Sequence, residues 1–511
     1  MTAERVDAVV IGAGPNGLSA AITLAEAGRD VVVCEAADTP GGAVRTEELT
    51  QPGFAHDTFS AVYPAGAASP VFARWPLGEH GLEWVHPEVA MAHPLPDGSA
   101  VALHRDPEAT AASLDAQAPG DGRGWLDLVG PLLSACPALR RTLLSGWLPV
   151  RGPVGLLARL GVGRVLELAR TALAPATVLA DERFAARGSR AWLLGSVHHG
   201  DVPADEAGSA MTGLYLQLLG HAVGWPSPRG GAQSLTNALV GYLQSLGGQV
   251  RTATRAEAVI SCQGRVAGVH TADGQQLRAD VVVADTTPQA VLALAGEQAL
   301  GWRYARALRR YRFGPGTVKI DWALDGPVPW RAPEARGAGT VHVGGLPEEI
   351  LQASHTVRQG ALPAQPFLLA GQQSLADPSR APQGGHTFWA YTRVPRGLDW
   401  SSGANAFLDA IEAQIERFAP GFADVARARH VLLPPDFAAR NANLSEGDVG
   451  TGTLALDQVA FRPVPTLAPY RTPLAGLYLG SAATFPGPAV HGVCGRAAAR
   501  FALAESRLRW W

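Results

Sequence analysis

Residues 7–21 read DAVVIGAGPNGLSAA, and residues 31–35 read VVVCE. The first run predicts an apolar strand that enters a glycine-rich turn and continues into a helix of small residues. The second run predicts another apolar strand, which ends in an acid. A strand, a GxGxxG turn, a helix and a second strand in this order are typical of a dinucleotide-binding unit.

The residue type at each key position of this unit can be explained by what the position must do. Gly12 permits a tight turn, Gly14 lets the backbone approach a pyrophosphate, and Gly17 lets the helix pack closely on the strand. The first turn of the helix offers free N–H groups to phosphate oxygens. Glu35 follows the second strand and suits the hydroxyl groups of a ribose.

A second glycine pair follows this acid. Residues 36–46 read AADTPGGAVRT, in which Gly41 and Gly42 allow another close approach of the backbone and Arg45 offers a cation to phosphate. Together the two stretches resemble the two-dinucleotide-binding motif of FAD flavoproteins, which include the phytoene desaturases and the flavin amine oxidases. The resemblance implies FAD with its adenosine on Glu35, and NAD(P) is the less favoured occupant. The cofactor-binding residues it implies here are Gly12, Gly14, Pro15, Asn16, Gly17, Glu35, Ala36, Gly41, Gly42 and Arg45.

Composition narrows the class of protein. The chain has 511 residues with a net charge of −3, and 47% of its residues are hydrophobic. This charge gives no electrostatic case for binding nucleic acid. The four cysteines are scattered, so neither a disulfide framework nor a metal site is predicted.

The same features predict the location and the partners. A reducing, cytoplasmic compartment suits unpaired cysteines. The first strand begins so early that no signal peptide is expected, and no apolar run reaches the roughly 18 residues that a transmembrane helix needs. We expect a soluble protein that binds an apolar small molecule, with peripheral membrane contact and a homodimer as open alternatives.

The chain order predicts an α/β fold with interleaved parts. We expect a Rossmann-like FAD domain with two dinucleotide-binding stretches from residues 1–75, 225–300 and 455–511. An interleaved mixed-sheet substrate domain is expected from residues 76–105 and 301–454, and a helical cap from residues 106–224. Apolar residues at helical spacing predict helices in the cap, at Trp125–Leu133, Val154–Leu173 and Met211–Val223. The leucine stripe in the second of these suits a helix core, with lipid contact as the alternative.

Three further segments carry candidate site residues. In the resembling family, the stretch after the second glycine loop returns toward the flavin ring, which implies His56, Asp57, Ser60 and Tyr63; the alternative is that Asp57 and Ser60 satisfy turn backbone. By the same resemblance, Ala258 and Val259 lie by the adenine. His198 and His199 are adjacent and should point to different faces, which argues against a shared metal.

The carboxyl-terminal part of the chain carries a second pattern that indicates a cofactor site. A strand at 471–480 is expected to end in glycine and to lead through a loop into a small-residue helix, an arrangement that favours anions. The resemblance implies Gly480, Ser481 and Ala482 near the pyrophosphate and ribityl chain, and Gly492 and Val493 near a flavin carbonyl.

The resemblance is near full length and extends to the phytoene dehydrogenase-like group that includes the pyridine nucleotide-disulfide oxidoreductase domain-containing protein 2. The matching stretches are 441–443, 447–448, 462–463, 470–473 and 490–492. The family usually has a longer glycine run before Val490, where this chain reads Gly487-Pro488-Ala489.

These observations predict an FAD-dependent oxidoreductase that takes a hydride from a carbon of a largely apolar substrate. If the reaction uses a protein base, His491 and Tyr63 are the candidate catalytic residues. One alternative is a flavin amine oxidase, with Trp322, Trp389 and Tyr391 as cavity aromatics or as core. Another is a flavin-binding protein or a non-redox isomerase. Lys319, on an alternating strand, is expected to face solvent, with a buried functional lysine as the alternative.

Overall fold

The N-terminal glycine motif follows a strand of a parallel five-stranded sheet. The structure is a computed structural model and describes residues 4–146 and 149–508. The strand order of this sheet is β10-β3-β2-β14-β20, so strands from the start, middle and end of the chain pair with one another. The strands are β2 (Ala8–Ile11), β3 (Val31–Cys34), β10 (Gln249–Arg251), β14 (Val281–Ala284) and β20 (Leu477–Leu479). Strands β2 and β3 are buried along their whole length, because both faces of a parallel sheet are covered.

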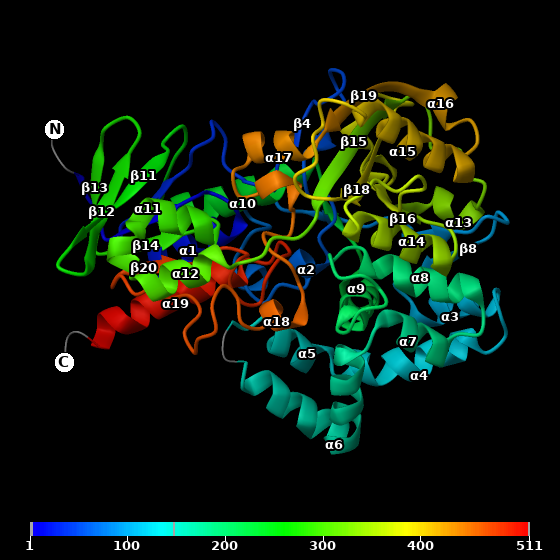
Figure 1. Ribbon diagram of the computed structural model, residues 1–511, viewed down its shortest axis with the longest axis horizontal. Coiled ribbons are helices and arrows are strands. Elements are labelled where there is room, and N and C mark those ends of the chain that lie inside the picture. Colours follow the sequence, from blue (N-terminus) through cyan, green and yellow to red (C-terminus); the bar gives the residue numbers. More distant parts are fainter. Residues whose placement is uncertain (1–3, 147–148, 509–511) are drawn as a thin grey trace.

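Helices cover one face of this sheet and a second sheet covers the other. Helices α1 (Pro15–Ala25), α10 (Ala232–Ser245) and α19 (Val493–Leu508) share one apolar cluster with alternate residues of β2 and β3. The opposite residues of these strands pack with a four-stranded sheet of order β1-β13-β12-β11 and with α11 (Pro288–Leu300) and α12 (Trp302–Arg309). That sheet consists of β1 (Glu4–Arg5), β11 (Ala256–Cys262), β12 (Arg265–Thr271) and β13 (Gln276–Arg278). Figure 1 shows these elements together at the end where both termini lie.

A seven-stranded mixed sheet forms the other half of the molecule (Figure 1). Its order is β19-β15-β18-β17-β16-β7-β8, and its neighbours are antiparallel except for the parallel pair β16 and β7. The strands are β7 (Val89–Pro94), β8 (Ala100–Leu103), β15 (Gly316–Leu324), β16 (Ala338–Val343), β17 (Leu368–Gly371), β18 (His386–Val394) and β19 (Ala426–Leu432). One face packs on α15 (Ala404–Phe418), through a cluster that includes Trp322 and Phe388.

A group of helices between residues 107 and 223 packs on the opposite face of this sheet. They are α3 (Pro107–Asp115), α4 (Asp121–Ser134), α5 (Cys136–Leu143), α6 (Arg151–Leu173), α7 (Ala176–Arg183), α8 (Arg187–Val197) and α9 (Ser209–Val223). The three helices expected at Trp125–Leu133, Val154–Leu173 and Met211–Val223 fall within α4, α6 and α9. Gly161 interrupts α6 with a φ of 74°, so this helix has two segments.

Short elements connect the larger ones. The strand pairs are β4 (Thr46–Glu47) with β5 (His56–Asp57) and β6 (Trp84–Val85) with β9 (Ser227–Pro228). The remaining helices are α2 (Pro64–Ala67), α13 (Pro333–Arg336), α14 (Pro347–Arg358), α16 (Phe422–Val425), α17 (Pro434–Arg440) and α18 (Leu456–Val459). Single 3₁₀ turns lie at Phe72–Arg74, Gln373–Leu375, Pro378–Arg380 and Ser445–Gly447.

Two expectations about local structure are wrong. The strand expected at 471–480 is confined to Leu477–Leu479, because the chain turns back at Gly476, with a φ of 91°, and Arg471 pairs with Tyr478 in an isolated bridge. Lys319, expected to face solvent, is 1% exposed. Residues 56–57 cover its face of the sheet, since the Lys319 ammonium donates to the Asp57 carbonyl at 3.1 Å.

Candidate functional site

Four strand ends meet at the carboxyl edge of the parallel sheet. Gly12, Glu35, Asp285 and Gly480 are the residues that directly follow β2, β3, β14 and β20. In an open α/β sheet, ligands bind at this edge. The tertiary structure therefore brings the N-terminal and carboxyl-terminal predicted cofactor residues to one place.

The N-terminal glycines have the conformations that the motif requires. Gly12 has a φ of 97°, which residues with a Cβ rarely adopt, and it leads into α1 with Gly14 as N-cap. A Cβ on Gly17 would collide with the Gly12 carbonyl oxygen, so the helix packs closely on the strand. Pro15 and Asn16 form the first turn of α1, and the first turn carries no acid that would compete for its N–H groups.

Glu35 is held at the same edge by backbone N–H groups. Its carboxylate accepts hydrogen bonds from Ala13 N at 2.7 Å and from Ala37 N at 2.9 Å. The Glu35 backbone carbonyl accepts from Thr254 N at 2.7 Å, which joins the chain just before β11 to this site. Ala36, the next predicted residue, is exposed.

The second glycine loop lies directly against the first. Gly41 N donates to the Ala13 carbonyl at 3.0 Å, and a Cβ on Gly42 would stand 3.2 Å from the Gly14 Cα. The Arg45 guanidinium donates to Thr39 Oγ1 at 2.8 Å and lies 3.8 Å from Glu47. The two predicted phosphate-facing loops are thus neighbours in space.

The carboxyl-terminal segment closes the site from the other side. Gly480 N donates to the Ala284 carbonyl at 2.9 Å, and α19 begins at Val493. A Cβ on Gly492 would collide with Ser19, and one on Gly495 would collide with the Asn16 carbonyl, so the start of α19 packs closely on the start of α1. Ser481 is buried beside this contact, and Ala482 is half-buried.

Ala258 and Val259 lie farther along, within β11 of the four-stranded sheet. Val259 packs its side chain in the same apolar cluster as Ile11 and Cys34. The Glu35 segment instead forms hydrogen bonds with Arg251 at the end of β10 and with Ala253 and Thr254, which precede β11.

Asp285 is a site residue that the sequence analysis did not single out. Its carboxylate accepts a hydrogen bond from Gly17 N at 2.8 Å. Burial raises the pKa of Asp285 to about 7, although this hydrogen bond lowers it, and the nearby Glu35 charge raises it further. The side chain of Asn443, in a stretch noted only as a family match, donates to the Asp285 carbonyl at 2.9 Å. The available signal was an acid placed directly after the apolar run 281–284.

The two candidate catalytic residues lie on neighbouring segments. The Ser69 hydroxyl donates to the His491 carbonyl at 2.7 Å, which ties the segment after Tyr63 to the loop before α19. His491 is 1% exposed, its Nδ1 accepts from Val493 N at 3.1 Å, and burial lowers its pKa to about 4. The Tyr63 hydroxyl donates to the Ser60 carbonyl at 2.7 Å, and burial raises its pKa well above the usual value. Near neutral pH both side chains are therefore uncharged.

The stretch 56–63 meets one face of the seven-stranded sheet through buried charges. Asp57 forms an ion pair with Arg380 and also accepts from Thr46 Oγ1 at 2.7 Å and Ala232 N at 2.8 Å. Lys319 pairs with Asp321, whose pKa burial raises to about 6. Asp57 thus accepts from the distant Ala232 N–H and pairs with Arg380, whereas the alternative given for it was a hydrogen bond to turn backbone.

The aromatic residues considered for an amine oxidase cavity do not form one set. Trp389 and Tyr391 stack on β18 with ring centroids 6.0 Å apart, on the same sheet face as Lys319. Trp322 points to the opposite face, where it packs against Phe388 and Phe422 in the core.

His198 and His199 point to different partners, as expected. His198 pairs with Ser354 at 3.2 Å, and His199 Nε2 lies 3.0 Å from His342 Nε2. Within residues 4–146 and 149–508, no group of three or more histidine, cysteine, aspartate or glutamate side chains could hold a metal ion.

The comparisons with known proteins decide the family. Residues 162–500 match the family described as flavin containing amine oxidoreductase, and residues 10–75 match the NAD(P)-binding Rossmann-like domain. The chain belongs to the flavin-containing amine oxidoreductase family. It is an FAD-dependent oxidoreductase, as its relatives also indicate.

Two relatives and one solved structure illustrate this membership. The mouse pyridine nucleotide-disulfide oxidoreductase domain-containing protein 2 is 29% identical over 96% of this chain and 92% of its own length. The phytoene desaturase (neurosporene-forming) of Rhodobacter capsulatus is 26% identical over 96% of this chain and 92% of its own length. An oxidoreductase from Methanosarcina mazei superposes with a TM-score of 0.63 at 16% identity, over 98% of this chain and 100% of that chain, which shows a shared fold.

The residues at the sheet edge fit FAD. The glycine loops carry no side chains where the backbone would approach the cofactor, and at Gly14 there is little room for one, since a Cβ would stand 2.9 Å from the Asp285 carboxylate. The Asn16 Oδ1 atom is an acceptor that is buried without a hydrogen-bond partner among the described residues, so it suits a donor group of the cofactor, whereas phosphate oxygens suit the N–H groups of the helix terminus. No helix in the described part of the chain is long and apolar enough to span a bilayer.

Proposed function

We propose that this flavoprotein is a dehydrogenase, desaturase or oxidase that removes a hydride from a carbon atom of an uncharged, largely apolar small molecule. Bound FAD supplies the hydride acceptor, and the chain supplies binding, orientation and exclusion of water. The predicted cofactor residues would hold FAD at the carboxyl edge of the parallel sheet.

The apolar interior between the seven-stranded sheet and helices α3–α9 supports an uncharged, largely apolar substrate. Its buried residues form one large apolar cluster that includes Met91, Trp225 and Leu369. The histidines beside this cluster are uncharged near neutral pH, because burial lowers the pKa of His93 to about 4 and those of His198 and His199 to about 3.

The same region disfavours an alkylammonium substrate. Arg393 lies beside the Tyr391 ring, with its guanidinium carbon 5.6 Å from the ring centroid, and it donates to the His199 carbonyl at 3.4 Å. A substrate cation would be repelled by this arginine. The phytoene desaturase relative acts on a hydrocarbon, in keeping with this proposal.

Anaerobic flavin reduction tests the proposal. The holoenzyme is mixed with phytoene, as an apolar polyene, and separately with an alkylamine, and flavin absorbance is followed. We expect bleaching by the polyene. A preparation that binds no FAD, bleaching by the amine alone, or isomerisation of the polyene without flavin reduction would overturn it. Admission of oxygen then separates an oxidase, which reoxidises rapidly and releases peroxide, from a dehydrogenase.

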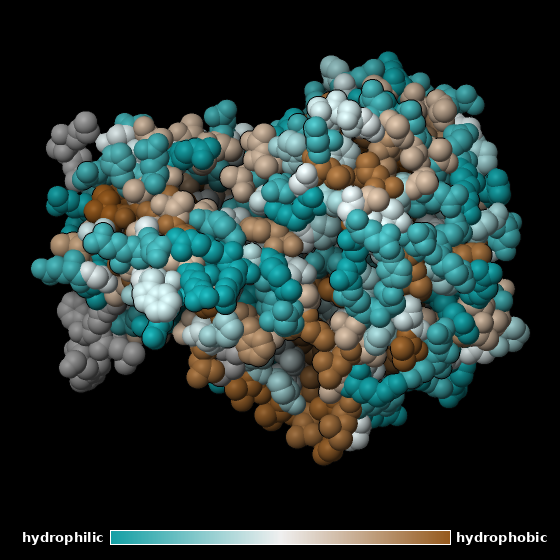
Figure 2. Space-filling view, viewed as in Figure 1, coloured by the Kyte–Doolittle hydropathy of each residue, from teal (hydrophilic) through white to brown (hydrophobic). Residues whose placement is uncertain are grey.

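We also propose that helix α6 rests on a membrane surface. Its exposed apolar side chains include Val154, Val162 and Leu166, which are 62%, 64% and 64% exposed. Figure 2 shows the corresponding hydrophobic patch at the lower edge of the molecule, where Figure 1 places α6. The exposed Arg159 and Arg164 on the same helix suit anionic lipid headgroups.

Sedimentation with anionic vesicles tests this surface. The double variant Val154→Asp with Leu166→Asp should lose vesicle binding, whereas Leu467→Asp, at a position that is 77% exposed elsewhere, should keep it. A homodimer that the double variant dissociates, with no vesicle binding by the unaltered protein, would show that α6 contacts a second copy instead.

We also propose boundaries for the domains and a cellular location for the protein. We propose an FAD domain of residues 1–75, 225–300 and 455–511, a substrate domain of 76–105 and 301–454, and a cap of 106–224. A cytoplasmic location is supported by the four unpaired cysteines, of which Cys262 is the exposed one. Limited proteolysis and cell fractionation check these two points.

A further inference from the structure

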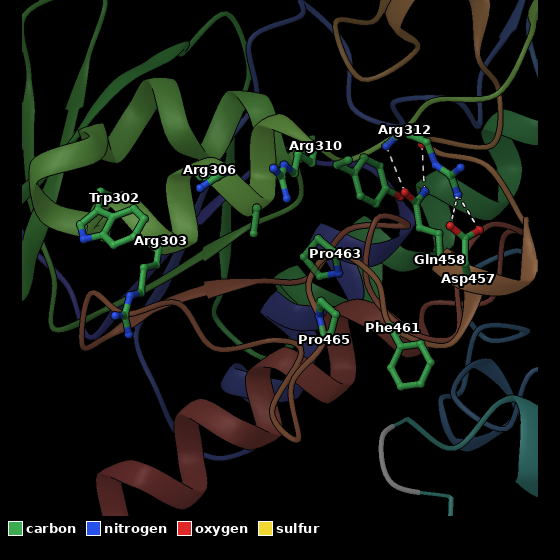
Figure 3. Close-up of a pocket in the computed structure, with 12 residues that line it drawn as sticks. Trp302, Arg303, Arg306, Arg310, Arg312, Asp457, Gln458, Phe461, Pro463 and Pro465 are labelled. Atoms are coloured by element: carbon green, nitrogen blue, oxygen red, sulfur yellow. Dashed lines mark hydrogen bonds and ion pairs between the residues drawn. The ribbon is translucent and has the colours of Figure 1, made fainter.

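A surface groove of about 590 Å³ lies between α12 on one side and α18 with the chain that follows it on the other. Figure 3 shows Trp302, Arg303, Arg306 and Arg310 along one wall, with Phe461 across from them. This volume falls within the roughly 300–1,000 Å³ of small-molecule sites. None of its lining residues belongs to the FAD cradle described above.

The groove has an excess of positive charge. Arg303, Arg306 and Arg310 are exposed, and none of them has a carboxylate partner among the described residues. The lining carboxylate, Asp457, is already paired with Arg312. Although the chain has a net charge of −3, this groove carries three arginines that lack a carboxylate partner among the described residues.

The spacing of these cations suits a short chain of phosphates. Positions 303, 306 and 310 follow an i, i+3, i+7 pattern, which places them on one face of α12 and its C-cap. At about 1.5 Å per residue, the outer two stand roughly 10 Å apart along the helix. A guanidinium group can donate two parallel hydrogen bonds to two oxygens of one phosphate, which makes arginine the side chain best suited to binding phosphate.

The groove also offers aromatic faces. Trp302 is 59% exposed at one end of the arginine row, and Phe461 is 49% exposed on the opposite wall. The Arg303 guanidinium carbon lies 5.3 Å from the centroid of the Trp302 ring, so Arg303 covers part of the indole and a nucleobase would stack on the part that is exposed. We propose that this groove binds a nucleotide-sized phosphorylated molecule, with its phosphates on Arg306 and Arg310 and its base against Trp302.

A nucleotide fits these observations better than an acidic protein segment does. The cations line one wall of a hollow, and aromatic rings stand beside them, which suits a ligand with one anionic end and one flat end. An acidic peptide would use the cations and make no use of the exposed indole surface of Trp302.

Isothermal titration calorimetry of the holoenzyme with ADP tests whether the groove binds a nucleotide. FAD is kept in excess, so that the ADP half of the cofactor site is filled, and released FAD is measured. We expect one ADP per chain. The double variant Arg306→Ser with Arg310→Ser should weaken ADP binding at least tenfold. Arg309→Ser is the matched control, because Arg309 is on the same helix but is paired with Glu297 outside the groove, and it should change binding less than twofold.

Three further measurements separate the contribution of the phosphates from that of the base. Inorganic pyrophosphate should bind and adenosine should bind poorly, while Trp302→Ala should weaken ADP more than pyrophosphate. Absence of ADP binding, equal loss in Arg309→Ser, or equal affinity for adenosine and ADP would overturn the proposal. Binding of a polyglutamate peptide but not of ADP would assign the groove to an acidic protein. The FAD content of each variant confirms folding, so the result does not depend on the oxidoreductase substrate.

Discussion

The Asp285 carboxylate accepts a hydrogen bond from the Gly17 N–H at 2.8 Å, across 268 residues of sequence. Asp285 directly follows β14 and Gly17 lies in the first turn of α1, so this bond joins the middle of the chain to the glycine motif. Burial raises the pKa of Asp285 to about 7. Near neutral pH, its protonation therefore sets the charge beside the predicted phosphate loop.

Asp285→Asn should change how stability depends on pH. A carboxyl group whose pKa is raised from 3.8 to about 7 in the folded state favours folding most at low pH, and this contribution is lost as pH rises through that range. The free energy of unfolding of the variant should therefore improve relative to the unaltered protein by up to about 4 kcal/mol between roughly pH 4 and 7. Urea unfolding of the apoprotein at several pH values measures this, and a pH-independent difference would show an unshifted pKa.

Glu35→Gln should weaken FAD binding. Glu35 already accepts from Ala13 N and Ala37 N, and its remaining acceptor capacity is what the ribose would use. Replacing one oxygen by an amide nitrogen removes a charged acceptor, which is worth about 1.5–3 kcal/mol, or at least tenfold in Kd. Titration of apoprotein with FAD measures the change. Glu26→Gln, just after α1, is the control and should leave Kd unchanged; equal effects would mean that Glu35 does not contact FAD.

Gly495→Ala should damage the contact between α1 and α19. Its new Cβ would collide with the Asn16 carbonyl oxygen, which is backbone and cannot move aside. We expect a loss of about 1–3 kcal/mol in the free energy of unfolding, together with lower FAD occupancy. Gly163→Ala, which meets nothing within 4 Å in helix α6, should instead be neutral or stabilising. Thermal unfolding and flavin content report both effects, and unchanged values for Gly495→Ala would contradict the close packing.

Arg380→Met should be strongly destabilising. The Arg380–Asp57 pair is 1% exposed on both sides, so removing one partner leaves a buried carboxylate without its counter-ion, at a cost of about 3–5 kcal/mol. The exposed pair of Arg5 and Asp280 provides the comparison, where Arg5→Met should cost less than about 1 kcal/mol. Equal losses in urea unfolding would show that burial of the first pair does not matter.

Sequence patterns predicted the motif-bearing elements well because their signals are local. The N-terminal strand, glycine turn and helix were predicted within a few residues of β2 and α1. The expected strand at 471–480 failed because an apolar run does not reveal that the chain folds back at Gly476.

Lys319 shows why burial was harder to predict. Lys319 and Asp321 alternate with Val318, Ile320 and Trp322, a pattern that is typical of a strand with one wet face. Residues 56–57 cover that face, so both charged side chains are buried and pair with each other. Nothing local in the strand encodes this cover.

The sequence by itself determined the dinucleotide-binding unit and the FAD-type second loop, because the spacing of glycines and the placement of one acid set backbone conformations within some 40 residues. Only the tertiary structure decided which distant residues complete the site. Parallel pairing of β14 and β20 beside β2 places Asp285 and Gly480 at the sheet edge where Gly12 and Glu35 follow their own strands. Such pairing depends on contacts between segments hundreds of residues apart, which no local pattern records.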